Sequence, residues 1–195
     1  FSSSASLLLD MSSSASLGLT WSHSQRAPSV EELYSNFGLI DAEACVIHFA
    51  TGACETGDVN LGEEQANNID LTLYLERGNF NASITAFYNA FDDYIAQITT
   101  GADVNGLPVR AYRQLDARFS GLEVDATFIV NDFVDFQVFG DMVNGNLKDN
   151  GDAPRLPPSR LGARLNIDGD NWTAYLSVLH ANEQNKPGNF ELATD

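Results

Sequence analysis

The residues with the most chemical potential in this sequence are three histidines, two cysteines and an excess of acids. His23, His48 and His180 stand far apart in the sequence, and none lies in a recognisable catalytic-triad context. The adjacent Asp92 and Asp93 point to opposite faces if their segment is a regular strand, so they cannot work as a carboxylate pair. Phosphate-binding loops and GxSxG, HExxH and CxxC motifs are absent. We therefore predict that the chain is not an enzyme and has no catalytic or cofactor-binding residues.

Cys45 and Cys54 are the only cysteines, and they lie close together in a polar stretch. Such a pair suits a disulfide in an oxidising compartment such as the periplasm or the cell surface. A small loop closed in this way gains roughly 2–3 kcal/mol if the bond is unstrained. We predict the Cys45–Cys54 disulfide, with two free thiols as the alternative.

The chain carries 27 acidic and 10 basic residues, which gives a net charge of −17. The electrostatic field of this negative charge repels nucleic acid and attracts cations, so we expect no nucleic-acid partner. The plainer interpretation is that the acids keep a lumen and its loops hydrated. No stretch approaches the roughly 18 consecutive apolar residues of a membrane helix, so contact with lipid would require a barrel or a surface.

Apolar and polar residues alternate along most of the chain, which indicates strands with two different faces. From Ile69 to Glu76, every odd position is aliphatic and most of its neighbours are polar. No long segment has a helical period, so the predicted class is all-β. The predicted strands cover residues 3–10, 14–24, 66–77, 79–97, 108–130, 134–144, 158–167 and 172–182, to within about two to four residues.

The connections between these strands alternate in length. Tight turns are predicted near 11–13, 78–79, 131–132 and 168–171, and longer loops near 25–65, 99–107 and 145–157. Short turns on one rim and long loops on the other are typical of an outer-membrane barrel, whose long loops face outward. A soluble β-sandwich would show the same alternation with its leucines in a core, so the periodicity alone leaves both architectures open.

One connection carries a recognisable motif. Residues 22–34, Ser-His-Ser-Gln-Arg-Ala-Pro-Ser-Val-Glu-Glu-Leu-Tyr, resemble the S-x-R-x-P-S-x-x-E-L-Y signature of TonB-dependent receptor barrels. Further similar segments follow in the order of that family: 48–51, 60–65, 67–71, 87–89, 91–95, 121–123, 140–141, 154–162 and 184–186. The resemblance implies an antiparallel up-and-down transmembrane β-barrel in the bacterial outer membrane. Residues 1–195 would supply about eight of its about 22 strands.

The resemblance also implies what surrounds this segment. An N-terminal plug domain and the last barrel strands would lie outside residues 1–195, and residues 25–65 would form a long extracellular loop. The implied partners are outer-membrane lipid, the TonB complex acting through the plug, and a metal ion or metal chelate. No cofactor is implied.

Within this superfamily the chain is most similar to the ZnuD-type zinc-uptake receptors. The similarity lies in His48-x-Ala50-Thr51-x-x-x-Glu55, followed by Asn60-Leu61 and Asn67-Asn68-Ile69. It implies that His48 is a metal ligand and Glu55 a weaker candidate, because a neutral imidazole nitrogen is a good zinc ligand. A histidine in a loop is otherwise simply solvated. Nearby acids would raise the local cation concentration: Asp41, Glu43 and Asp58.

The resemblance thus predicts an outer-membrane receptor that takes up a metal ion or metal complex, zinc favoured, with energy from the TonB system. A passive porin-like or structural barrel is one alternative, and a secreted β-sandwich that binds a partner is another. Cys45 and Cys54 depart from the pattern of many relatives and bracket His48, so the substrate stays open.

Overall fold

The computed structural model describes residues 1–36, 45–49 and 51–194 of the chain. These residues form one sheet and one short helix. The elements are β1 (Ser2–Ser12), β2 (Ala15–Arg26), α1 (Val30–Tyr34), β3 (Ile47–His48), β4 (Ala53–Thr56), β5 (Glu64–Arg77), β6 (Phe80–Val104), β7 (Leu107–Asn131), β8 (Val134–Leu147), β9 (Gly151–Asp152), β10 (Arg160–Asp168) and β11 (Thr173–Ala181). No helix in the described part of the chain is long and apolar enough to cross a membrane.

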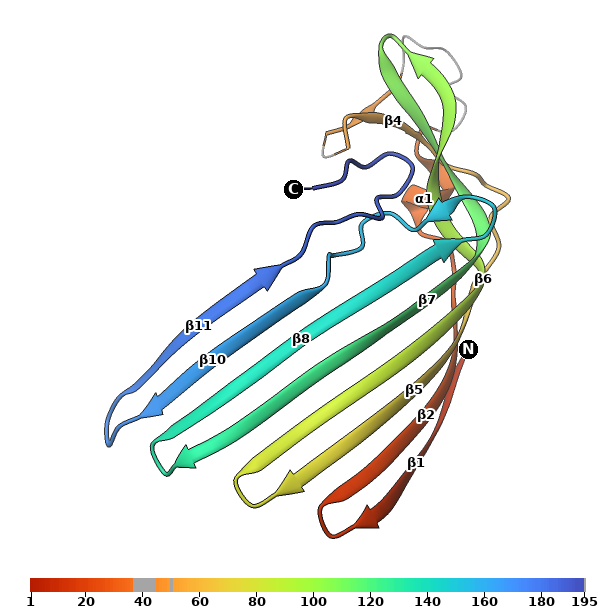
Figure 1. The fold of residues 1–195 in the computed structure, drawn as a ribbon. Helices are drawn as coiled ribbons and strands as arrows, with labels where there is room; N and C mark the ends of the chain where they lie inside the picture. Colours follow the sequence, from red (N-terminus) through yellow and green to blue (C-terminus); the bar gives the residue numbers. More distant parts are fainter. Residues whose placement is uncertain (37–44, 50, 195) are drawn as a thin grey trace.

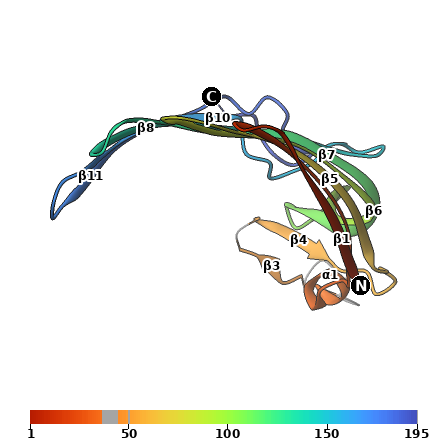
Figure 2. The same ribbon diagram turned by 90° about the horizontal axis from the view of Figure 1, so that it is seen from below.

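The long strands form a continuous antiparallel meander in the order β1-β2-β5-β6-β7-β8-β10-β11. The short strands β3, β4 and β9 lie off this path. Figures 1 and 2 show a curved sheet that stays open between β1 and β11. The prediction of an all-β chain built on about eight strands of an up-and-down barrel is confirmed.

The apolar face of the sheet has no protein cover in the described structure. Ile69, Leu71, Leu73 and Leu75 share this face, and Leu71 lies in register between apolar residues of β2 and β6. Leu71 is 43 % exposed and Leu176 of β11 is 69 % exposed. A β-sandwich would bury these side chains in a shared core, so the soluble-sandwich alternative is wrong.

The polar face of the sheet is its concave side. Asp70 and Glu76 alternate with the leucines of β5 and so point to this face. Arg26, on the polar face of β2, contacts Glu32 of α1, and α1 lies inside the arc (Figure 2). A cavity of about 440 Å³ lies against the same face and is lined by acids of β7 and β8, among them Asp125.

Apart from the turn between β6 and β7, short turns and long connections are sorted to opposite ends of the sheet (Figure 1). The four hairpin turns β1–β2, β5–β6, β7–β8 and β10–β11 form the turn end. The described parts of the segment between Arg26, at the end of β2, and Glu64, at the start of β5, lie at the other end, here called the loop end. They fold back over the concave side and contain α1, β3 and β4 (Figure 2).

The predicted loop over 99–107 is wrong, because β6 and β7 continue through it to Val104 and Leu107. Asn105 and Gly106 both have positive φ, 54° and 83°, which suits a tight two-residue hairpin turn. Gly101 lies where the register between the strands shifts. These turn-forming residues therefore do not end β6 and β7 at the rim of the sheet. They bend and close a long hairpin that projects beyond it.

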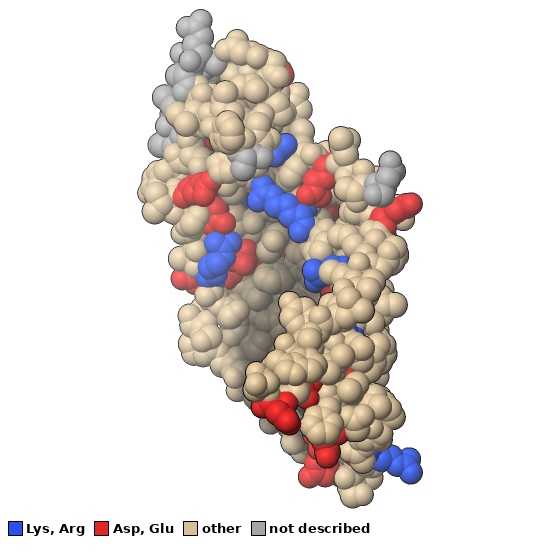
Figure 3. Space-filling model, turned by 90° about the vertical axis from the view of Figure 1, so that its left-hand side faces the viewer, with Lys and Arg blue, Asp and Glu red and all other residues tan. Residues whose placement is uncertain are grey.

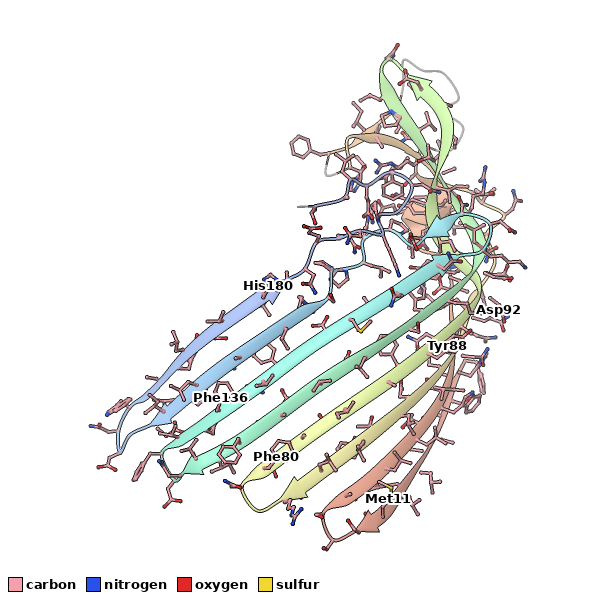
Figure 4. All side chains as sticks on the ribbon, in the orientation of Figure 1. Met11, Phe80, Tyr88, Asp92, Phe136 and His180 are labelled. Carbon is pink, nitrogen blue, oxygen red and sulfur yellow. A yellow bond between two sulfur atoms is a disulfide. The ribbon has the colours of Figure 1, made fainter. Side chains whose placement is uncertain are left out.

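The bulge in β6 corrects one further expectation. The register shifts between Phe91 and Tyr94, and Asp93 has a φ of 58°. Asp92 and Asp93 (Asp92 is labelled in Figure 4) therefore do not lie in a regular strand, and their side chains need not point to opposite faces of the sheet. Phe91, Tyr94 and Phe119 form edge-to-face ring pairs around the small buried cluster at the loop end.

Candidate functional site

Three potential metal ligands meet at the loop end, on the segment that folds over the concave side. They are Glu31 of α1, His48 of β3 and Glu55 of β4, and one ligand atom from each lies within 4.8 Å of the others. His48 Nε2 is 3.8 Å from Glu31 Oε1, and His48 Nδ1 is 3.8 Å from Glu55 Oε1. The imidazole therefore lies between two carboxylates. All three side chains line a pocket of about 320 Å³.

Glu55 is the buried member of this cluster, with 3 % of its surface exposed. Strand β4 pairs in parallel with β7, so Glu55 lies in register with Arg110 and is fixed to the wall of the sheet. The hydroxyl of Thr51 donates to Glu55 Oε1 at 2.6 Å, and the hydroxyl of Tyr112 donates to Glu55 Oε2 at 3.3 Å. These two donors orient a carboxylate that has been taken out of water.

Tyr112 stays protonated at physiological pH. Burial, together with the nearby carboxylates of Glu55 and Glu31, raises the pKa of its phenol to about 12. The hydroxyl is therefore a hydrogen-bond donor to Glu55 and not an anionic metal ligand. Gln97 donates to the same hydroxyl at 2.9 Å, and Arg155 donates to Gln97 at 3.0 Å.

Glu31 is positioned by the start of helix α1. Ser29 caps the helix and forms a capping box with Glu32, in which each side chain accepts a hydrogen bond from the other residue's backbone N–H. Arg26 pairs with Glu32 at 2.9 Å and with Glu64 at 3.0 Å, which ties the helix to β2 and β5. Burial raises the pKa of Glu32, but hydrogen bonds from Arg26 and Ser29 outweigh it and leave the pKa below its ordinary value.

His48 lies on a small hairpin made of β3 and β4. A disulfide joins Cys45 to Cys54 across this hairpin, with the two Cα atoms 6.0 Å apart. The side chain of Asn36 adds a second link. Its amide donates to the carbonyls of Val46 and Glu55, and its oxygen accepts from the N–H of Val46.

Arginine side chains lie near the acids of the site. Figure 3 shows basic residues gathered above the hollow of the concave face, with acids to either side. Arg110 is 8 % exposed, its guanidinium lies 4.1 Å from the ring centre of Phe190, and its Nε has no hydrogen-bond partner in the described structure. Arg155 lines a pocket of about 390 Å³ that it shares with Glu31 and Tyr112.

The structure brings together His48 and Glu55, the two residues that the sequence singled out, and adds Glu31. Glu31 belongs to the recognised motif of residues 22–34, but nothing in the sequence indicates its distance from His48. Asp58 is held by hydrogen bonds from Asn60, and Arg113 pairs with it at 3.1 Å. The remaining predicted acids, Asp41 and Glu43, lie outside the described residues.

The other two histidines lie away from the cluster. His23 of β2 shares a hydrogen bond with Asn67 of β5 at 3.0 Å. His180 of β11 is in register with Leu161, on the apolar outer face, and Figure 4 places it near the loop end of its strand.

One imidazole and two carboxylates suit a divalent cation. The two 3.8 Å separations involve different ring nitrogens of His48, and a single ion binds only one of them. With one ligand atom from each residue, the three atoms lie within 4.8 Å of one another, whereas zinc ligands at normal bond lengths are about 3.3 Å apart in a tetrahedral site, so the side chains have to draw together to hold an ion. Zinc takes four ligands in a closed site, and this cluster offers three.

The chain matches the model of a known family, described as TonB dependent receptor-like, beta-barrel, over residues 1–192. Its fold is similar to that of the copper transporter OprC, with a TM-score of 0.75 and 16 % identity, covering 95 % of this chain and 27 % of that one. The siderophore receptor PirA from Acinetobacter baumannii gives a TM-score of 0.69 at 15 % identity, and the match covers 94 % of this chain and 29 % of that one. The FrpB iron transporter from Neisseria meningitidis gives a TM-score of 0.57 at 16 % identity, and the match covers 87 % of this chain and 24 % of that one. The chain spans between 24 % and 29 % of the length of these proteins.

Proposed function

This chain belongs to the family of TonB-dependent receptor β-barrels, and from that premise we propose that it forms part of a receptor that takes up a metal ion or metal complex, with zinc favoured. The barrel is located in the outer membrane. The family consists of receptors and transporters, which confirms the prediction that the chain is not an enzyme. In the proposed receptor, the loop end faces the cell exterior and residues 25–65 form an extracellular loop.

The observation that carries the metal proposal is the convergence of Glu31, His48 and Glu55 from three separate elements within 4.8 Å. Nitrogen and oxygen donors of this kind suit zinc and other divalent cations, whereas soft metals such as Cu(I) prefer sulfur. Both cysteines are joined in the disulfide, and neither methionine lines the pocket of the cluster. Met11 lies by a short turn at the opposite end (Figure 4), and Met142 lies on β8 in register with Leu122 of β7. This donor set argues against Cu(I), and the preference for zinc among divalent cations rests on the resemblance to the ZnuD-type receptors.

The proposed site is shared with parts of the receptor outside this chain. A fourth ligand would come from the plug or from another loop, so residues 1–195 alone should hold zinc weakly. The plug would also connect the barrel to the TonB complex, which supplies the energy for release. A passive porin-like barrel is the alternative, but neither the family nor a loop that folds over the concave face with clustered ligands supports it.

The test is zinc titration of the full-length receptor and its His48→Ala variant, with zinc uptake measured in zinc-starved cells. We expect His48→Ala to weaken zinc binding at least about tenfold, because loss of one of so few ligands removes a large share of the affinity. His23→Ala is the matched control, since His23 lies on β2 and contacts Asn67. Equal affinity and uptake in wild type and His48→Ala would remove His48 from the site.

A further inference from the structure

The two strands of the His48 hairpin are held very differently. On β4, Ala53, Cys54 and Glu55 are all buried, at 0 %, 4 % and 3 % exposure, and the strand pairs with β7. On the β3 side, Val46 is 70 % exposed and Ile47 is 48 % exposed. Strand β4 is therefore part of the wall of the sheet, whereas β3 has little packing of its own.

Pairing between the strands is too short to hold β3 in place. The ladder has only two residue pairs, Ile47 with Cys54 and His48 with Ala53. Even complete isolated hairpins are marginally stable in water. The turn adds hydrogen bonds from the N–H groups of Thr51 and Gly52 to the carbonyl of His48. These contacts orient the backbone at His48 but do not fix it to the barrel.

The Cys45–Cys54 disulfide supplies the missing attachment. Cys54 is buried in the anchored strand, next to Glu55, and Cys45 precedes the exposed strand that carries His48. Asn36 reinforces the link, because its side chain bonds to both Val46 and Glu55. Because β4 is paired with β7, the covalent bond to Cys54 also holds the start of the β3 segment in place.

We propose that the Cys45–Cys54 disulfide positions His48 against Glu55 and Glu31, and so sets the metal affinity of the site. Breaking the bond leaves Glu55 in place on β4 but releases His48. The inference rests on the proposed function, since it concerns the same cluster of ligands. It adds that the two cysteines are determinants of metal binding and not merely of loop stability.

A mutant cycle on the full-length receptor tests this, with zinc as the probe. Replacing both cysteines by serine should weaken zinc binding about tenfold, the lower end of what loss of a ligand-orienting group usually costs. His48→Ala should then have an effect of less than about threefold in the disulfide-free receptor, because residues that act together are not additive. Glu55→Gln is the matched comparison, and its effect should be the same in both backgrounds, since β7 holds Glu55.

The inference would be overturned if the disulfide-free receptor bound zinc with wild-type affinity. It would also be overturned if His48→Ala weakened zinc binding by the same factor with and without the disulfide. A wild-type receptor that binds no zinc would overturn the proposed metal function as well, so the two failures are distinguishable. If the double serine variant does not insert, the folded wild-type receptor can be reduced with a phosphine and both thiols capped with iodoacetamide. Capping also prevents free thiolates from acting as new zinc ligands.

Discussion

The three candidate ligand side chains differ in how firmly they are held in place. Glu55 is buried and held by two hydroxyl donors, Glu31 is exposed on a helix, and His48 depends on a covalent link nearby. The local motif and the resemblance it supports predicted His48 and Glu55. They could not predict Glu31, because its distance from His48 depends on how α1 docks against residues 57 and 58. That docking leaves no periodic pattern in the sequence.

The ion pairs of Arg26 make the docking of α1 dependent on pH. Because the pKa of Glu32 in the folded state lies below its ordinary value of 4.5, the Glu32 carboxylate contributes its full stabilisation above that value. The contribution is lost as the pH falls through the lowered pKa. The carboxylates of Glu32 and Glu64 both pair with the guanidinium of Arg26. We expect limited proteolysis of residues 27–36 to accelerate below about pH 4.5 in the folded receptor.

Glu32→Gln isolates the charge, because glutamine at this position can keep the capping box. The variant should be cleaved faster than wild type at neutral pH and should show little further change on acidification. The exposed Glu63 is the control, and Glu63→Gln should behave like wild type. A cleavage rate in Glu32→Gln that equals wild type at pH 7 would show that the Arg26 pair does not hold the helix.

At the scale of elements, long strands were predictable and short ones were not. Lipid on one side and water on the other impose a strict two-residue alternation on a strand such as β5, so its faces are visible in the sequence. Two-residue strands such as β3 carry no period, and the parallel contact of β4 with β7 joins segments far apart in the chain. The hairpin over 99–107 was missed because its glycines indicate a bulge and a tight turn as well as a loop.

Gly57 makes the close contact that docks α1. A Cβ atom at this position would lie 2.5 Å from the backbone carbon of Leu33 and 2.6 Å from the nitrogen of Tyr34. The N–H of Gly57 donates to the carbonyl of Ser35 at 2.7 Å. We expect Gly57→Ala to push α1 away and to destabilise its docking by about 1–3 kcal/mol, the usual cost of overpacking. Faster hydrogen exchange at the amides of Leu33 and Ser35 would report this.

Gly62→Ala is the matched control for this glycine. A Cβ atom there would meet only the side chain of Gln114, at 3.8 Å, so exchange in α1 should not change. Because Glu31 moves with the helix, Gly57→Ala should also weaken zinc binding by the full-length receptor. Unchanged exchange in Gly57→Ala would mean that the helix does not rest on this backbone.

On the scale of the whole molecule, the convex face of the arc has the layout of a lipid-facing barrel wall. Phe80, Phe128 and Phe136 lie in register across β6, β7 and β8 near the short turns, and Figure 4 shows Tyr88 nearer the loop end. From residue 80 to residue 88 the strand advances roughly 27 Å. Allowing for strand tilt, these aromatic positions span most of an apolar band about 25 Å tall, with rings near both of its borders.

The bilayer, rather than a protein core, should therefore stabilise the apolar face. Leu71 lies in the middle of this face, between Leu19 and Ala86, and is 43 % exposed. We expect Leu71→Arg to destabilise the full-length barrel in lipid vesicles by about 2–4 kcal/mol, the cost of a cation near the bilayer midplane, measured by guanidinium unfolding. Ser83→Arg is the control, because Ser83 lines the cavity on the polar face beside Glu123 and Asp125, and it should cost far less. Equal losses in the two variants would show that the leucine face does not meet lipid, since the penalty depends on which face carries the charge.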